Sequence, residues 1–146
     1  MNYIVYFDGY SSPKLKRRAG YCVLIYDQNY KLIRETIVAL DPTETNNVAE
    51  GMGLINACQQ LWDLKIYQSS VNTKTCVVSH SRAVIYGDSE LVIRMYHNRV
   101  RLKSKRLQEV HEKIRIIKRL IGPYVDVKWV PRSANKAGQL ISKKKI

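Results

Sequence analysis

Residues 2–10 carry the sequence NYIVYFDGY, and the rest of the chain is organised around the Asp8-Gly9 pair inside it. The five residues before Asp8 are all aromatic or β-branched, a composition that favours a β-strand. A carboxylate within so apolar a run is costly to bury unless its charge is compensated. Asp8 is therefore the first candidate for a functional residue.

Two further acids lie in similar surroundings. Glu50 follows TNNVA at residues 45–49, and Asp88 follows the apolar run AVIYG at residues 83–87. Carboxylate oxygens are the ligands that hard divalent cations prefer in proteins. Asp8, Glu50 and Asp88 are therefore predicted to converge on a metal site.

The length and composition predict an ordinary globular protein. We expect one domain over residues 1–146, because 45% of the residues are hydrophobic and 25% are charged. No apolar stretch approaches the roughly 20 residues of a membrane span, and the first residues lack the pattern of a signal peptide. These features predict an intracellular, cytoplasmic monomer with no membrane partner.

The charge is the strongest signal in the composition. Lys and Arg number 25 against 12 Asp and Glu, a formal net charge of +13, which predicts a polyanionic partner. Three cysteines, Cys22, Cys58 and Cys76, are too few and too scattered for a disulfide framework or a zinc site. Cys22 and Cys58 are expected to be core thiols, although one bridge stays open because intracellular proteins of hyperthermophiles do form them.

Residue patterns predict three consecutive strands over residues 2–9, 19–28 and 31–40, arranged as an antiparallel meander. A basic loop links the first two strands. A helix is expected after residue 42, capped by Thr43 or Thr45. The remaining predicted elements are a strand over 82–86, a helix over 89–95, a longer helix over 102–120, a strand over 124–130 and a last helix opening at 133–135. Residues 65–81 fit either a hairpin or a loop.

This order of elements predicts an α/β fold. Its centre is a five-stranded mixed sheet in which the first three strands are antiparallel and the last two are parallel, with helices covering the sheet.

Five short motifs follow one another along the chain: YFDG at residues 6–9, TNNVAE at 45–50, GDSELVI at 87–93, KSKRL at 103–107, and WVPR at 129–132 followed by NK at 135–136. With these motifs the chain resembles the type 1 ribonuclease H family, and particularly its compact archaeal and bacterial form. The resemblance covers residues 2–139 and implies the ribonuclease H-like fold.

The resemblance also implies hydrolysis of the RNA strand of an RNA–DNA hybrid, using two Mg²⁺ or Mn²⁺ ions. In that mechanism Asp8 bridges both ions, and Glu50 and Asp88 complete their coordination. Without metal, three close carboxylates would repel one another and raise one another's pKa values.

The sequence departs from the family pattern at its fourth acid. That residue is expected four positions after Asn135, which is Gln139 here, or Gly138 if one residue is deleted. Neither side chain is acidic, and no Asp or Glu follows Asp126. Gln139 is therefore predicted as an atypical fourth catalytic position, with one of the two ions held weakly.

Substrate contacts are predicted from charge and from the motifs. Lys and Arg neutralise phosphates without reading sequence, so cleavage is expected to be sequence-independent. Asn46 and Asn47 resemble the family's minor-groove residues, although either could instead cap the helix. The full predicted substrate-binding set is Gly9, Lys14, Lys16, Arg17, Arg18, Asn46, Asn47, Ser89, Lys103, Lys105, Arg106, Arg132 and Asn135, with an RNA–DNA hybrid or another duplex nucleic acid as partner.

Three functions remain open from the sequence. The first is a hybrid-specific ribonuclease, the second a catalytically impaired or inactive nucleic-acid-binding module of the same fold, and the third a DNA nuclease related to resolvases and integrases. The Thr45 to Glu50 motif favours the first over the third. Only the missing fourth acid favours the second over the first.

Overall fold

The computed structural model describes residues 2–12, 17–72 and 77–144, with residues 70–72 and 77–79 described by their backbone alone. The strands are β1 (Asn2–Ser12), β2 (Arg18–Asp27), β3 (Leu32–Leu40), β4 (Ser69–Asn72), β5 (Val77–His80), β6 (Arg82–Gly87) and β7 (Val125–Trp129). The α-helices are α1 (Asn46–Asp63), α2 (Glu90–Tyr96), α3 (Lys105–Ile121) and α4 (Lys136–Lys143), and short 3₁₀ turns cover Gly122–Tyr124 and Arg132–Ala134.

Five strands form the central sheet in the order β3-β2-β1-β6-β7. β1 pairs antiparallel with β2, which pairs antiparallel with β3, whereas β6 lies parallel to both β1 and β7. This arrangement confirms the predicted five-stranded mixed sheet, in which β6 and β7 run parallel to β1.

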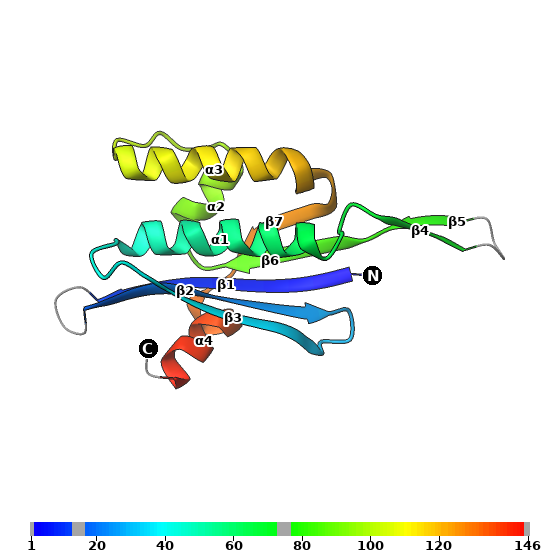
Figure 1. The fold of residues 1–146 in the computed structure, drawn as a ribbon, viewed down its shortest axis with the longest axis horizontal. Helices are drawn as coiled ribbons and strands as arrows, with labels where there is room; N and C mark the ends of the chain where they lie inside the picture. The colour runs from blue at the N-terminus through cyan, green and yellow to red at the C-terminus, as the bar shows by residue number, and fades with distance from the viewer. Residues whose placement is uncertain (1, 13–16, 73–76, 145–146) are drawn as a thin grey trace.

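Helices cover the two faces of the sheet unequally. Helices α1, α2 and α3 lie on one side, and the short α4 lies on the other (Figure 1). Because side chains alternate along a strand, Val5 and Phe7 of β1 belong to the core that includes α1 and α3, while Tyr6 packs in a second cluster with Ala137 and Ile141 of α4.

Helix α3 buries the apolar side chains of Val110, Ile114 and Ile121. The helix begins at Lys105 rather than near residue 102, because the Ser104 side chain accepts a hydrogen bond from the backbone N–H of Leu107 and caps it there. It packs closely on α1 at Gly51, where a Cβ atom would lie only 2.6 Å from Cγ1 of Val110.

Residues 65–81, which fit either a hairpin or a loop by their sequence, contain a hairpin. β4 and β5 pair antiparallel, with Ser69 opposite His80, and in Figure 1 they project beyond the end of α1. Cys22 and Cys58 are buried free thiols, as predicted, whereas Cys76 lies outside the described residues. None of the helices in the described part of the chain combines the length and apolar character needed to span a membrane.

Candidate active site

Three acids from three different elements meet at one point. Asp8 lies in β1, Glu50 in the second turn of α1 and Asp88 directly after β6, and one carboxylate oxygen of each lies within 4.8 Å of the others. The predicted convergence of these three residues is therefore present in the structure.

The sheet itself opens where the acids meet. The ladder between β1 and β6 ends at Tyr6 and Tyr86, two residues before Asp8 and Asp88. Gly9 then lets α1 approach β1 closely, since a Cβ atom at this position would clash with the backbone nitrogen of Glu50. Gly9, predicted to bind substrate, thus has a packing role that brings Glu50 to Asp8.

The acids are buried with little compensating positive charge. Asp8 is 4% exposed and Glu50 6%. Within the described part of the chain, Oδ1 of Asp8 and Oδ2 of Asp88 have no hydrogen-bond partner, and the nearest cation to Asp88 is Nε of Arg132 at 3.9 Å. Buried polar atoms normally have partners, so these oxygens are available to a ligand from outside the chain.

Burial dominates the electrostatics of the site. It raises the pKa of Asp8 to about 8, an effect that the charges of Asp88 and Glu50 reinforce. Burial likewise raises the pKa of Glu50 to about 7, although hydrogen bonds from Ser89 and Asn46 oppose the shift. Oxygen-only donors that repel one another fit a hard divalent cation, which would satisfy the unpaired oxygens and remove the repulsion.

Helix α4 is fixed beside Asp8 by Asn135. The Asn135 side chain is fully buried, donates to the carbonyl oxygen of Phe7 at 2.9 Å and accepts from the backbone N–H of Ala137 at 3.1 Å. Asn135 was predicted to bind substrate. Its burial and its two hydrogen bonds make it an anchor that joins α4 to β1, and its contact with substrate stays a prediction.

The structure places Gly138, and not Gln139, against Asp8. A Cβ atom on Gly138 would lie 2.9 Å from Oδ2 of Asp8. Gln139 is exposed, lines a pocket together with Asp8 and Gly138, and donates from Nε2 to the carbonyl oxygen of Ser133 at 2.7 Å. The role of Gln139 as a metal ligand stays a prediction, but the place that faces Asp8 carries no side chain.

Two hollows flank the acids. One, of about 660 Å³, lies between Asp8 and α4, and the other, of about 320 Å³, lies over Glu50 and Asp88. Asn46 and Arg132 line both hollows, and Arg132 is an exposed cation. The hollow over Glu50 and Asp88 is also lined by Asn47 and Ser89.

Of the predicted N-cap candidates for α1, Thr45 caps the helix. Its Oγ1 accepts from the backbone N–H of Val48 at 3.3 Å, so Thr45 is the N-cap. Asn46 and Asn47 are both exposed beside the acids, where Asn46 donates to Oε1 of Glu50 at 3.3 Å. Ser89 caps α2 through the N–H of Val92.

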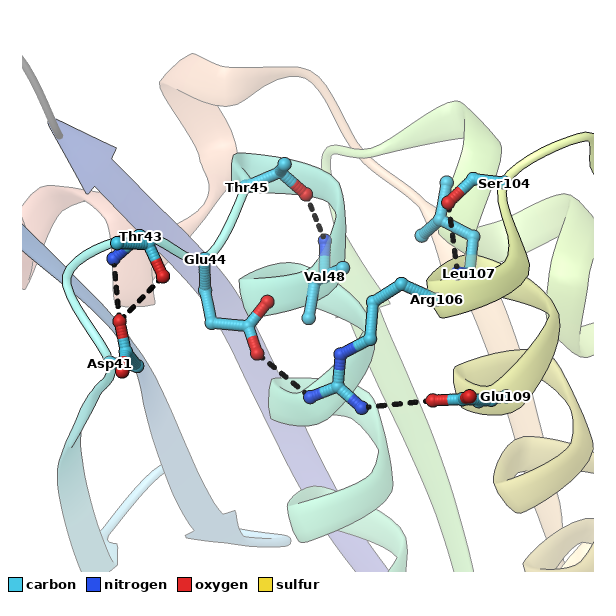
Figure 2. Close-up of polar contacts among 9 residues, drawn as sticks. All are labelled: Asp41, Thr43, Glu44, Thr45, Val48, Ser104, Arg106, Leu107 and Glu109. Atoms are coloured by element: carbon cyan, nitrogen blue, oxygen red, sulfur yellow. Dashed lines mark hydrogen bonds and ion pairs between the residues drawn. The ribbon is translucent and has the colours of Figure 1, made fainter.

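The predicted basic residues differ in whether their side chains already form ion pairs within the protein. Arg106 donates to Glu44 at 2.8 Å and to Glu109 at 3.4 Å, which ties the start of α3 to the segment before α1 (Figure 2). Lys103 and Lys105 are exposed on either side of the α3 cap. Arg17 and Arg18 are also exposed, whereas Lys14 and Lys16 lie outside the described residues.

Comparison with known proteins assigns the family. A model of the family described as reverse transcriptase-like matches residues 6–145. The chain belongs to this family, a ribonuclease H family. Among solved structures, LC11-RNase H1, isolated from compost and also solved in complex with an RNA/DNA hybrid, is 27% identical in that complex, with 99% of each chain covered and a TM-score of 0.75.

Two more distant structures share the fold. RNase H1 from the halophilic archaeon Halobacterium salinarum is 18% identical over the whole of both chains, with a TM-score of 0.73. The N-terminal RNase H domain of a Mycobacterium tuberculosis protein is 21% identical, with 96% of this chain and 95% of that chain covered and a TM-score of 0.71.

Sequence reasoning missed two residues that shape this ribonuclease H-family site. The indole N–H of Trp129 donates to the main-chain carbonyl oxygen of Asp88 at 3.1 Å and fixes the segment after β6. The main-chain carbonyl oxygen of Glu44 accepts a hydrogen bond from Ser11 Oγ at 2.8 Å, and its carboxylate accepts one from Arg106. Trp129 lies within a quoted motif, which was a usable signal, whereas nothing in the local sequence pairs Glu44 with residues so distant.

Proposed function

We propose that this protein is a metal-dependent endoribonuclease that hydrolyses the RNA strand of RNA–DNA hybrids by a two-metal-ion mechanism, without sequence preference. The observation that carries the proposal is the convergence of Asp8, Glu50 and Asp88 with buried oxygens that lack partners. Similarity to a ribonuclease H1 that was solved with an RNA/DNA hybrid supports the choice of substrate.

The three carboxylates are the residues that would hold the ions, Mg²⁺ or Mn²⁺. When bound, such ions polarise the phosphodiester and lower the pKa of a coordinated water. The protein's own part is to keep the ligands in place. Asn46 and Ser89 hydrogen-bond the Glu50 carboxylate, and Trp129 holds the backbone of Asp88.

Surrounding polar and basic groups would bind the duplex. Arg132, which is exposed and lies 3.9 Å from Asp88, would pair with a phosphate oxygen near the reacting bond. Lys103 and Lys105 would neutralise phosphates farther along the strand. Asn46 and Asn47 lie where an amide could contact a ribose 2′-hydroxyl, the group that separates RNA from DNA.

The test is cleavage of a duplex with labels on both strands, in Mg²⁺ and separately in Mn²⁺, with Asp8→Asn as the control. We expect cleavage of the RNA strand of a hybrid, no cleavage of a matched DNA duplex, and loss of activity by at least about a thousandfold in the variant. Cleavage of the DNA duplex would support the DNA-nuclease alternative instead.

The second candidate is a non-catalytic module that binds hybrids. The observation that favours it is Gly138, which leaves the place facing Asp8 without a carboxylate. This alternative predicts a tight, salt-dependent complex with the hybrid and no strand cleavage in either metal.

A further inference from the structure

The face of the sheet that carries α4 is only partly covered by that helix. α4 has eight residues, a length of about 12 Å, whereas five strands at their usual spacing span about 19 Å. Ala137 and Ile141 of α4 pack on side chains of β1 and β2. Ile4 of β1 and Tyr86 of β6, on the same face, are half-buried. In the described part of the chain, no other α-helix lies on this side of the sheet (Figure 1).

Four tyrosines form a continuous strip on this face. Between ring centroids, Tyr6 of β1 lies 5.5 Å from Tyr86 of β6 and 5.9 Å from Tyr26 of β2. The ring of Tyr30 follows 6.0 Å from that of Tyr26. Tyr6 is buried, whereas Tyr26 and Tyr86 are half-buried and Tyr30 is 54% exposed. A ligand would therefore reach this tyrosine strip at its two ends, Tyr30 and Tyr86.

Tyr30 lies where the backbone disfavours a tyrosine. Its φ of 61° is in the left-handed region, which Gly and Asn adopt readily and bulky residues rarely do. Asp27 fixes the turn, because its carbonyl oxygen accepts from the N–H of Tyr30 and its Oδ1 accepts from the N–H of Lys31, both at 3.0 Å. Residues held in such sparsely populated regions cluster at functional sites. The turn explains a Gly or an Asn at this position, but not an exposed aromatic ring.

Lys136 of α4 lies against the strip. Its Nζ is 4.9 Å from the ring centroids of both Tyr26 and Tyr30. This cation–π contact restrains the exposed Tyr30 ring, so less conformational entropy is lost when a ligand binds to it. A hollow of about 300 Å³ opens beside the contact, and its lining includes Tyr26, Leu32, Lys136 and Lys143.

A second cation flanks the other end of the strip. Lys128 of β7 lies in register with Tyr86 and is exposed. Two acids lie nearby on this face. Glu35 is already paired with Lys144 at 3.6 Å, and Asp126 lies two residues before Lys128 on the edge strand. The strip therefore combines aromatic rings with a cation at each end.

We propose that the tyrosine strip binds single-stranded nucleic acid. Unpaired bases stack on Tyr30 and Tyr86, and phosphates lie beside Lys128 and Lys136. Proteins that bind single strands without sequence preference combine positive charge with aromatic side chains in this way, because every base has a face that stacks on a ring. The net charge of +13 also favours a polyanionic ligand over an apolar one.

The position of the strip connects it to the acids. Tyr6 lies two residues before Asp8 in β1, which is about 7 Å along the strand. An unpaired end of a duplex bound at the acids would therefore lie beside the strip. The inference goes beyond the proposed function and does not depend on cleavage.

The test is the affinity for a labelled dodecamer of deoxythymidine, measured by fluorescence anisotropy in a chelator, beside that for a blunt-ended RNA–DNA hybrid of the same length. We expect Tyr30→Asn to weaken binding of the single strand at least about fivefold and to change binding of the blunt hybrid less than about twofold. Asn adopts the left-handed region readily, so the turn should be retained. The matched control is Tyr67→Asn, because Tyr67 is 39% exposed but packs on Trp62 of α1, on the other side of the sheet.

Photocrosslinking locates the bound strand. A single strand that carries 5-iodouracil should crosslink to Tyr30 or Tyr86, as identified by mass spectrometry of the digested protein. Tyr86→Leu keeps an apolar side chain on β6 and should weaken single-strand binding by a similar factor. If Tyr86→Leu does not fold, as judged by circular dichroism, Tyr30→Asn and the crosslinks decide the matter.

The outcomes separate this inference from the proposed function. No binding of the single strand by the wild type, an equal loss with Tyr67→Asn, or crosslinks confined to residues outside the strip would overturn the inference and leave the nuclease proposal standing. An equal loss of single-strand and blunt-hybrid binding with Tyr30→Asn would also overturn it. A loss restricted to the single strand and to the strip variants would support it, whether or not the hybrid is cleaved.

Discussion

At the scale of single residues, the buried Asp8 carboxylate lowers the stability of the folded protein. The sequence places a carboxylate inside an apolar strand, and the structure buries it beside two other acids with one oxygen unpaired. Burying an unpaired charge destabilises a fold. The metal-free protein therefore carries a cost that a bound cation would relieve, as is common where activity requires a strained site.

Asp8→Asn should stabilise the metal-free protein while it abolishes cleavage. The amide keeps the shape of the side chain and removes a carboxyl group whose ionised form is disfavoured by burial and by the neighbouring acids. We expect the melting temperature in a chelator to rise by about 3 °C or more. Asp126→Asn, an exposed strand position, is the control and should change it little. A lower melting temperature for Asp8→Asn would mean that the charge has a stabilising partner.

The advantage of Asp8→Asn in a chelator should grow as the pH rises from about 4.5 to about 8. Burial raises the pKa of Asp8 to about 8, far above its ordinary value. Over this interval the folded wild type binds more protons than the unfolded chain, so its free energy of unfolding falls with increasing pH. Asn cannot titrate. Melting curves of both proteins across the interval measure the difference, and a gap that narrows with pH would contradict the expectation.

At the scale of elements, the site depends on how helices are fastened to β1. Asn135 fastens α4 through the carbonyl oxygen of Phe7, directly before Asp8. Glu44 fastens the start of α1 to β1 through Ser11 and to α3 through Arg106 (Figure 2). These contacts place the N-terminal ends of α1 and α4 around the acids.

Asn135→Ala should destabilise the protein by about 2 kcal/mol, because it removes an N-cap and leaves the carbonyl oxygen of Phe7 without its buried donor. Urea unfolding measures the loss. Gln139→Ala, on the same helix but exposed, is the control and should cost under about 0.5 kcal/mol. Equal effects of the two substitutions would show that the Asn135 contacts contribute nothing specific.

At the scale of the whole molecule, the net charge of +13 governs association with nucleic acid. The N-terminal ends of α1 and α3 lie at the same end of the molecule (Figure 1). Lys105 is the first residue of α3, and Glu50 lies in the second turn of α1. Asp27 pairs with Tyr3 near the start of β1, at the opposite end of the β1–β2 pair from Asp8. Lys31 lies in the turn region shortly after Asp27 and is therefore far along the sheet from Asp8.

Hybrid binding should weaken steeply with salt, and its slope should identify the lysines that contact phosphate. In the Asp8→Asn background without divalent ions, Lys103→Ala and Lys105→Ala should each reduce the slope of log K against log salt by about 1. Lys31→Ala is the matched control and should leave the slope unchanged. Fluorescence anisotropy at several salt concentrations measures it, and a loss with Lys31→Ala alone would place the duplex elsewhere.

Local sequence determined much of this protein. Period-two and helical patterns gave the five sheet strands and four helices, and the acids were evident because carboxylates are conspicuous in apolar runs. The pattern placed the start of α3 about three residues early, since apolar spacing does not reveal that Ser104 caps the helix. It also left the β4–β5 hairpin open, because residues 65–74 are largely polar and turn-like.

Only the tertiary structure decided what surrounds Asp8. Counting along the chain points to Gln139, but the position of α4 on β1 presents Gly138, since a shift of one residue rotates a helix face by about 100°. The same packing buries Asn135, and the approach of α3 to α1 pairs Arg106 with Glu44. The sequence by itself determined which chemical groups the protein carries, and long-range packing determined which of them face the site.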